Sequence, residues 1–133
     1  MILSPRSRNG TARPTGERMG NFSVGDIVKV PFPYTDRDVR QRRPALVVSA
    51  TPLGGDGRLY WVLMITSAEH RRWPGDVALG RRYAEAGLPA PSLIRTSKIA
   101  TVEDGRMEPL GRLPDSFMET VRAELDQVLG RSV

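Results

Sequence analysis

The sequence predicts a mainly β domain that is completed by one C-terminal helix. Two apolar, β-branched runs, 43–50 and 59–66, are each bounded by residues typical of turns, which is the pattern of buried strands. A third run, 92–99, alternates between apolar and polar residues with the period of two that a strand requires. From 116 to 129, by contrast, apolar residues recur at helical spacing. A chain of 133 residues is long enough for one modest core.

The beginning of the chain differs in composition from the rest. Residues 1–20 are rich in Arg, Gly, Ser, Thr and Pro and contain almost no large apolar side chains, so we expect a disordered, basic extension. The folded domain is expected to cover residues 21–133. Within it, residues 37–98 carry eleven Lys and Arg against five Asp and Glu, a net charge of +6. Such a region can present a basic face to a polyanion, or it can form an ordinary solvated surface.

The first strand is expected over 24–32. Pro31 and Pro33, at its end, lack the amide hydrogen that an inner strand donates, so we place this strand at an edge of the sheet. Residues 25–26 predict a turn or bulge, with Asp26 capping backbone amides. The polar segment 35–41 then connects this strand to the run 43–50.

Shorter elements follow the central run 59–66. A basic loop is expected over 68–74, a short strand over 76–79 and one helical turn over 82–87. The alternation over 92–99 places one set of side chains on a common face, and a separate strand is expected to begin at residue 100. The side chains on that face are Leu93, Arg95, Ser97 and Ile99.

The C-terminal helix carries the clearest boundary signals. Ser116 and Glu119 have the spacing of a capping box, and Gly130 is the expected stop. Its apolar stripe is expected to pack on the core. The stripe consists of Phe117, Val121, Leu125, Val128 and Leu129.

Composition excludes several kinds of site. The chain has no cysteine, so disulfides and thiolate metal sites are excluded, and its only histidine is His70. No cluster of metal-ligating residues, P-loop or dinucleotide-binding motif is present, so we expect no metal and no cofactor. No apolar run is long enough for a membrane span, and the N-terminus lacks the apolar region of a secretory signal. A soluble, cytoplasmic protein without membrane contact is expected.

Cations and hydroxyls cluster at the predicted strand ends. Arg42 and Arg43 precede one buried run, and Thr66 and Ser67 end the next. RNA can be cut without metal because its 2′-OH attacks the neighbouring phosphorus, provided that the protein aligns the groups and stabilises charge on the phosphate. An arginine fork and a hydroxyl suit that task. These residues therefore permit a ribonuclease site, although paired surface cations and ordinary strand ends also explain them.

Several motifs, taken in order, resemble the PemK/MazF toxins of type II toxin–antitoxin systems. Each motif alone is weak, whereas the ordered set from about Val24 to Leu129 is considerably more specific. The motifs are Gly25-Asp26-Ile27-Val28, Pro31-Phe32-Pro33, Arg43-Pro44-Ala45-Leu46-Val47-Val48-Ser49, Ile65-Thr66-Ser67, Ser92-Leu93-Ile94-Arg95-Thr96-Ser97-Lys98-Ile99 and Gly111-Arg112-Leu113.

This resemblance implies a small SH3-like β-barrel of the CcdB/PemK type with a C-terminal helix, acting as a homodimer. It implies a sequence-specific, metal-independent endoribonuclease that cuts single-stranded mRNA and leaves a 2′,3′-cyclic phosphate and a 5′-OH. The implied partners are single-stranded RNA and a cognate antitoxin with an acidic and apolar C-terminal segment. Any DNA binding would be indirect, through that antitoxin.

The resemblance also implies roles for individual residues. The family's catalytic arginine maps to Arg43, which is expected to stabilise the phosphate and take part in proton transfer. The family's threonine maps to Thr66, which is expected to bind and orient the scissile group. The remaining RNA-binding residues expected at the site are Arg42, Ser67, His70, Arg95 and Ser97.

One position departs from the family pattern. Some members carry an acid two residues after the late-strand arginine, but here Arg95 is followed at that distance by Ser97. The departure leaves the general base unassigned, unless Asp36, Asp38 or His70 reaches the site from a loop. Two other functions stay open: a CcdB-like, non-enzymatic inhibitor of gyrase, and a degenerate member that binds RNA without cutting it.

Overall fold

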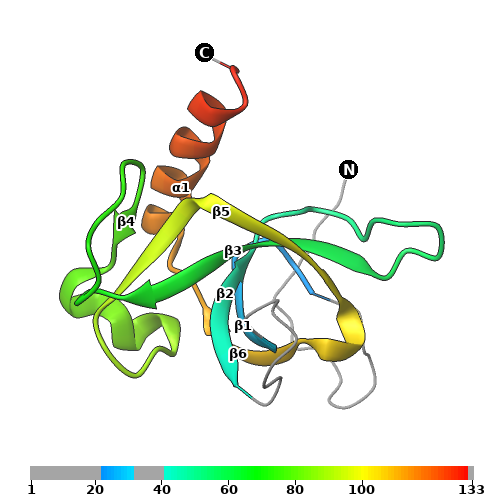
Figure 1. The fold of residues 1–133 in the computed structure, drawn as a ribbon, viewed down its shortest axis with the longest axis horizontal. Coiled ribbons are helices and arrows are strands. Elements are labelled where there is room, and N and C mark those ends of the chain that lie inside the picture. Colours follow the sequence, from blue (N-terminus) through cyan, green and yellow to red (C-terminus); the bar gives the residue numbers. More distant parts are fainter. Residues whose placement is uncertain (1–21, 32–40, 132–133) are drawn as a thin grey trace.

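One curled antiparallel sheet and a C-terminal helix make up the computed structural model, which describes residues 22–31 and 41–131 (Figure 1). The sheet has six strands in the order β4-β5-β3-β2-β1-β6 and curves into a half-barrel. The predicted mainly β fold with a C-terminal helix is therefore confirmed. The predicted extension 1–20 and nearly all of the connection 35–41 lie outside the described residues. The elements are β1 (Asp26–Pro31), β2 (Arg42–Val47), β3 (Leu59–Ser67), β4 (Val77–Ala78), η1 (Gly80–Ala86), β5 (Ser92–Glu103), η2 (Asp104–Arg106), β6 (Glu108–Arg112) and α1 (Asp115–Val128).

The sheet separates two hydrophobic clusters. Successive side chains of a strand point to opposite faces, and β3 follows this rule. Leu63 and Ile65 belong to the cluster that also contains Val121 of α1. Val62 and Met64 belong to the second cluster, on the other face of the same strand. Helix α1 therefore closes one face of the sheet, and the curl of the strands encloses the other.

Strand β1 is an inner strand, so its expected edge position is wrong. It pairs with β2 on one side and with β6 on the other. Pairing with β6 runs only from Asp26 to Lys29, so Pro31 lies beyond that ladder and its missing amide hydrogen interrupts nothing there. The predicted turn is confirmed, because Gly25 has a φ of 99° and Asp26 Oδ2 accepts a 2.9 Å hydrogen bond from the amide of Ser23.

Strand β5 is one strand of twelve residues, where the sequence predicts two. It pairs with β3 on both sides of a bulge. On one side Leu63 lies opposite Ile99. On the other side Ile65 lies opposite Ile94, so residues 95–98 face only one residue of β3. Extra residues of this kind bend a strand and break its simple alternation, which the sequence pattern does not reveal.

Helix α1 begins without the predicted capping box. Its N-cap residue is Pro114, and no side chain caps the first amides, because Ser116 and Glu119 already lie inside the helix. Asp115 supplies negative charge in the first turn, where the helix dipole favours it. The predicted stop is confirmed. Gly130 directly follows the C-cap residue, Leu129, and has a φ of 76°.

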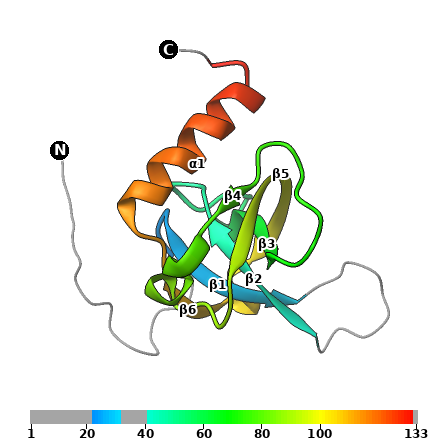
Figure 2. The ribbon, with the colours of Figure 1, turned by 90° about the vertical axis from the view of Figure 1, so that its left-hand side faces the viewer.

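The apolar stripe of α1 is buried only along its first part. Val121 is fully buried, and Phe117 and Leu125 pack against the same cluster. Val128 and Leu129, by contrast, are 63% and 64% exposed. Figures 1 and 2 show the reason, since the C-terminal turns of the helix extend beyond the strands.

Candidate functional site

The ladder between β2 and β3 assigns two of the predicted site residues to one face of the sheet. Ala45 of β2 lies opposite Met64 of β3. Arg43 and Thr66 each lie two residues beyond that pair, toward the same end of the ladder, and residues two apart on a strand point to one side. Both side chains are partly exposed. A guanidinium and a hydroxyl thus occupy neighbouring strands at one rim.

Thr66 is hydrogen-bonded to the only histidine of the chain. The Thr66 hydroxyl lies 2.8 Å from Nδ1 of His70, and the tautomer of the ring determines which of them donates. Ser67 shapes the turn that makes this contact possible. Its Oγ accepts a hydrogen bond from the amide of Glu69 at 3.1 Å, and its carbonyl oxygen accepts one from the amide of His70 at 3.1 Å.

Arg42 lies on the surface at this end of β2, and as the chain neighbour of Arg43 it points to the opposite face of the strand. Its Nη1 is 3.4 Å from Glu108 Oε2, and the two side chains are 39% and 57% exposed. An exposed pair of this kind is held weakly and exchanges readily with water or another anion. Arg42 therefore remains accessible to a phosphate.

Arg95 lies in the interior, away from the surface position that RNA binding would require. Its residue exposure is 5%, and its Nη1 is 3.4 Å from the buried carboxylate of Asp76. Its Nη2 donates a 2.9 Å hydrogen bond to the carbonyl oxygen of Arg71, and its Cζ lies 3.9 Å from the centre of the Trp73 ring. A guanidinium engaged in this way is not available to a phosphate.

Ser97 and Arg95 do not share one environment, although the alternation pattern predicts that they do. Ser97 is exposed, whereas Arg95 is buried. The bulge at 95–98 is the reason, since it breaks the regular pairing of β5 with β3. The structure therefore does not bring together all of the predicted site residues.

A match to a protein-family model shows which family the chain belongs to. The model for the PemK-like, MazF-like toxins of type II toxin–antitoxin systems matches residues 23–129. The chain belongs to this toxin family. No curated protein matches the sequence.

Solved structures of MazF toxins have the same fold as this PemK/MazF-like toxin. MazF in a MazE–MazF complex from Deinococcus radiodurans is 26% identical, with a TM-score of 0.64 over 83% of this chain and 96% of that chain. MazF alone from the same organism is 26% identical, with a TM-score of 0.61 over 81% and 96% of the two chains. An endoribonuclease in complex with its cognate antitoxin, from a mycobacterial species, is 19% identical, with a TM-score of 0.64 over 84% and 97%.

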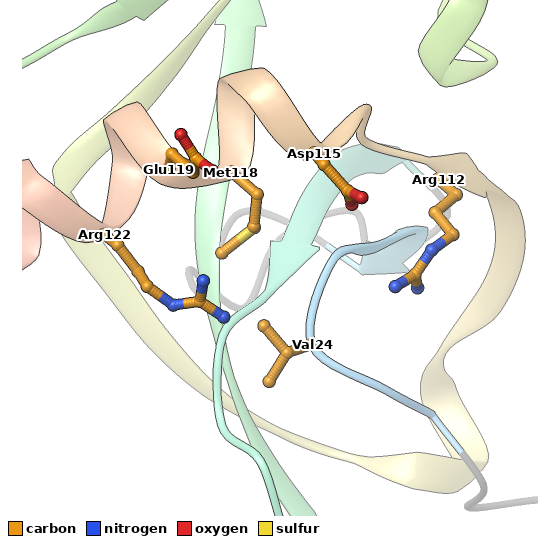
Figure 3. Close-up of a pocket in the computed structure, with 6 residues that line it drawn as sticks. All are labelled: Val24, Arg112, Asp115, Met118, Glu119 and Arg122. Carbon is orange, nitrogen blue, oxygen red and sulfur yellow. The ribbon is translucent and has the colours of Figure 1, made fainter. Parts of the chain in front are cut away.

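One pocket of the toxin lies away from the rim that carries Arg43 and Thr66. Figure 3 shows it between the start of α1 and the segment that leads into β1. Arg43 lies opposite Val30 in the ladder between β1 and β2. Val30 is four residues further along β1 than Asp26, a distance of about 13 Å at the ordinary rise of a strand. The pocket is lined by Val24, Arg112, Asp115, Met118, Glu119 and Arg122. It contains none of the residues predicted for the site.

Within the described residues, the toxin offers no group of three His, Asp or Glu side chains that could hold a metal ion. No helix in that part of the chain is long and apolar enough to cross a membrane. The candidate acids Asp36 and Asp38 lie outside the described residues, so His70 is the one of the three proposed loop residues whose place is known.

Sequence inspection missed the residues that surround Arg95. Asp76 is 7% exposed, and its Oδ2 accepts a hydrogen bond from the amide of Trp73 at 2.9 Å. The local signal was present in Pro74-Gly75, a turn dipeptide directly before an acid that can cap it. The long-range contact with Arg95 left no signal, because it depends on how β5 bends.

Proposed function

We propose that this toxin is a sequence-specific, metal-independent endoribonuclease that cuts single-stranded mRNA and is neutralised by a cognate antitoxin. Membership of the family supports the class of activity. The observation that carries the proposal is the placement of Arg43 and Thr66 on one face, at the same end of adjacent strands, with an imidazole nitrogen 2.8 Å from the Thr66 hydroxyl.

The substrate supplies the nucleophile in this reaction. The ribose 2′-oxygen forms a bond to the adjacent phosphorus as the 2′-OH loses its proton, and the bond from phosphorus to the 5′-oxygen breaks. The 5′-oxygen takes up a proton, so the products are a 2′,3′-cyclic phosphate and a 5′-OH. The protein must align these atoms and stabilise the charge that gathers on the phosphate oxygens.

Arg43 suits the second task. Its guanidinium presents paired donors in a fixed plane, so it can stabilise the phosphate by hydrogen bonds. Thr66 suits the first task, because its hydroxyl can contact the 2′-OH or a phosphate oxygen while it keeps its bond to His70. Arg42, on the surface beside them, is the proposed contact for a neighbouring phosphate.

The proposed partners follow from the same rim. An antitoxin segment that blocks this rim needs acidic groups for Arg42 and Arg43 and apolar side chains for the adjoining surface. The MazE–MazF complex among the similar structures supports a partner of this kind. A homodimer in the cytoplasm is proposed as the working form.

The test is cleavage of mixed single-stranded RNA by the purified toxin in EDTA, with the fragment ends identified by mass spectrometry. We expect fragments with cyclic phosphate ends. Arg43→Ala should lower the cleavage rate by about 10²- to 10³-fold, the usual cost of losing one preorganised donor. Arg122→Ala is the matched control, since this arginine lines the pocket on α1, and its rate should equal that of the wild type.

Two outcomes contradict the proposal. Cleavage that is absent in EDTA and restored by magnesium would require a different mechanism. An Arg43→Ala toxin that cuts at the wild-type rate would place the chemistry elsewhere, and salt-sensitive RNA binding without any product would make the protein a binder only.

A further inference from the structure

The loop between β3 and β4 folds around the guanidinium of Arg95. This loop, residues 68–76, carries His70 near its start and Asp76 at its end. Arg95 contacts it at three places: the carboxylate of Asp76, the carbonyl oxygen of Arg71 and the ring of Trp73. One side chain of β5 therefore holds both the middle and the end of the loop.

Further hydrogen bonds fix the end of the loop beside Arg95. The amide of Asp76 donates to the carbonyl oxygen of Trp73 at 3.1 Å, and the amide of Trp73 donates to Asp76 Oδ2 at 2.9 Å. Arg72 Nη2 donates to the carbonyl oxygen of Asp76 at 3.3 Å. Thr96, next to Arg95 on β5, donates its hydroxyl to the carbonyl oxygen of Gly75 at 2.8 Å.

The start of the loop is fixed as well. The amide of Ala68 donates to the carbonyl oxygen of Pro91 at 3.0 Å, and Ser67 accepts bonds from the amides of Glu69 and His70. With both ends held, the backbone that carries His70 keeps its place beside Thr66. An otherwise exposed histidine thereby gains a defined place at the rim.

We propose that Arg95 and Asp76 are positioning residues, which hold the loop so that His70 takes the proton of the attacking 2′-OH through the Thr66 hydroxyl. The inference rests on the proposed nuclease function and assigns the general base that the sequence leaves open. It also gives Arg95 a role that involves no contact with RNA.

The proton path balances as follows. The 2′-OH gives its proton to Thr66 Oγ as the 2′-oxygen bonds to phosphorus, and the Thr66 hydroxyl gives its own proton to Nδ1 of His70. The 5′-oxygen leaves and takes a proton from water, and the hydroxide so formed neutralises the imidazolium. This path requires a neutral ring with its proton on Nε2, so that Nδ1 accepts from Thr66.

The first experiment measures single-turnover cleavage by His70→Ala and His70→Gln. Each variant should lose about 10²-fold or more in rate, as expected when a general base is removed. Added imidazole should restore part of the rate of His70→Ala and none of the rate of Arg43→Ala. Full activity in both His70 variants, with Arg43→Ala inactive, overturns this inference and leaves the nuclease proposal standing. If Arg43→Ala is active as well, the nuclease proposal itself fails.

The second experiment tests positioning by ¹⁵N NMR of the imidazole, in a chain whose only histidine is His70. The wild type should show one fixed tautomer with the proton on Nε2. Arg95→Met should average the two tautomers and lower the single-turnover rate about as much as His70→Ala does. Arg95→Lys, which keeps a cation opposite Asp76, should recover part of the preference for the Nε2 tautomer and part of the cleavage rate.

A matched control and a second variant keep this test decisive. Arg82 also pairs with a carboxylate, that of Glu85, and lies 5.0 Å over the ring of Phe117, but it is on η1. Arg82→Met should change neither the tautomer nor the rate. Because Arg95→Met leaves the buried Asp76 carboxylate without its cation, Arg95→Met/Asp76→Asn is used if the single variant does not fold. A folded Arg95 variant with the wild-type tautomer and rate overturns the positioning role.

Discussion

At the scale of single residues, the contact between Thr66 and His70 changes what the rim of the sheet can do. A threonine hydroxyl alone can orient a substrate, but it is a poor base, because an alcohol oxygen is only weakly basic. A hydrogen bond of 2.8 Å to an imidazole nitrogen gives the hydroxyl a partner that can store a proton. In the proposed mechanism, the pair therefore combines positioning and proton transfer in one place.

Thr66→Val tests this combination with little change in shape. Valine keeps the β-branched side chain that a strand end favours and removes only the hydroxyl, so the fold should be retained. We expect the single-turnover cleavage rate to fall by about 10²- to 10³-fold. Thr66→Ser keeps the hydroxyl and should stay within about tenfold of the wild type. Equal rates for the valine variant and the wild type would show that the hydroxyl takes no part.

The sequence could locate Arg43 and Thr66 because both follow from strand ends. A buried, β-branched run has recognisable ends, so the sequence places Arg43 and Thr66 at strand ends. The register that pairs Ala45 with Met64 puts both on one face, and the sequence alone does not give that register. The burial of Arg95 could not be predicted in this way. It depends on the bulge at 95–98 and on Asp76, which is nineteen positions earlier in the chain.

At the scale of elements, β6 lies close to the end of η1 at Gly111. A Cβ atom added to Gly111 would collide with the carbonyl oxygen of Ala86 and lie 3.0 Å from Cα of Gly87. These are backbone atoms, which cannot rotate away as a side chain can. Only glycine lets β6 lie so near the end of η1, and the contact fixes η1 against the sheet.

Gly111→Ala should therefore destabilise the toxin by about 3 kcal/mol, the upper part of the range for an overpacked site. The measurement is urea unfolding followed by circular dichroism. Gly105→Ala is the control, because a Cβ there meets no atom within 4 Å, and its free energy of unfolding should change by less than about 0.5 kcal/mol. A similar loss in both variants would show that the clash at Gly111 is not the cause.

The elements differ in how far the sequence predicts them. Local signals were sufficient for β3 and for the body and end of α1, since apolar period and the final glycine depend on neighbours in the chain. The start of α1 was misjudged because Pro114 already fixes a φ suited to a helix entrance, so the capping pair Ser116 and Glu119 is not needed there.

At the scale of the whole molecule, the order of the strands is the feature that the sequence did not reveal. Strand β1 lies between β2 and β6, so its second neighbour comes from the far end of the chain. Two prolines suggested an edge, but the partner strand stops short of Pro31 and makes that argument irrelevant. Packing of the whole chain determines which distant strands pair, and a local sequence pattern does not show it.

The charge distribution predicts a salt-dependent affinity for RNA. Residues 37–98 carry a net charge of +6, whereas residues 99–133 carry four Lys and Arg against seven Asp and Glu. We expect the logarithm of the affinity for single-stranded RNA to fall linearly with the logarithm of the salt concentration. Arg42→Ala should reduce that slope by about 0.7, the value for one phosphate contact on a single strand. Arg122→Ala should leave the slope unchanged, and fluorescence anisotropy measures both. Equal slopes for Arg42→Ala and the wild type would remove Arg42 from the RNA surface.

The four residues of β5 that face a single residue of β3 uncouple the two halves of that long strand. The half that begins at Ser92 is tied to β4 and to the loop with His70, and the half that ends at Glu103 is tied to Leu59 at the start of β3. A change of chain length after Thr96, between Ser97 and Lys98, can be absorbed there without shifting the ladder partners on either side or the contacts of Arg95 and Thr96 with the loop. We expect relatives of this toxin to tolerate insertions and deletions at this point, and their loops around the rim to diverge while the rest of the sheet keeps its register.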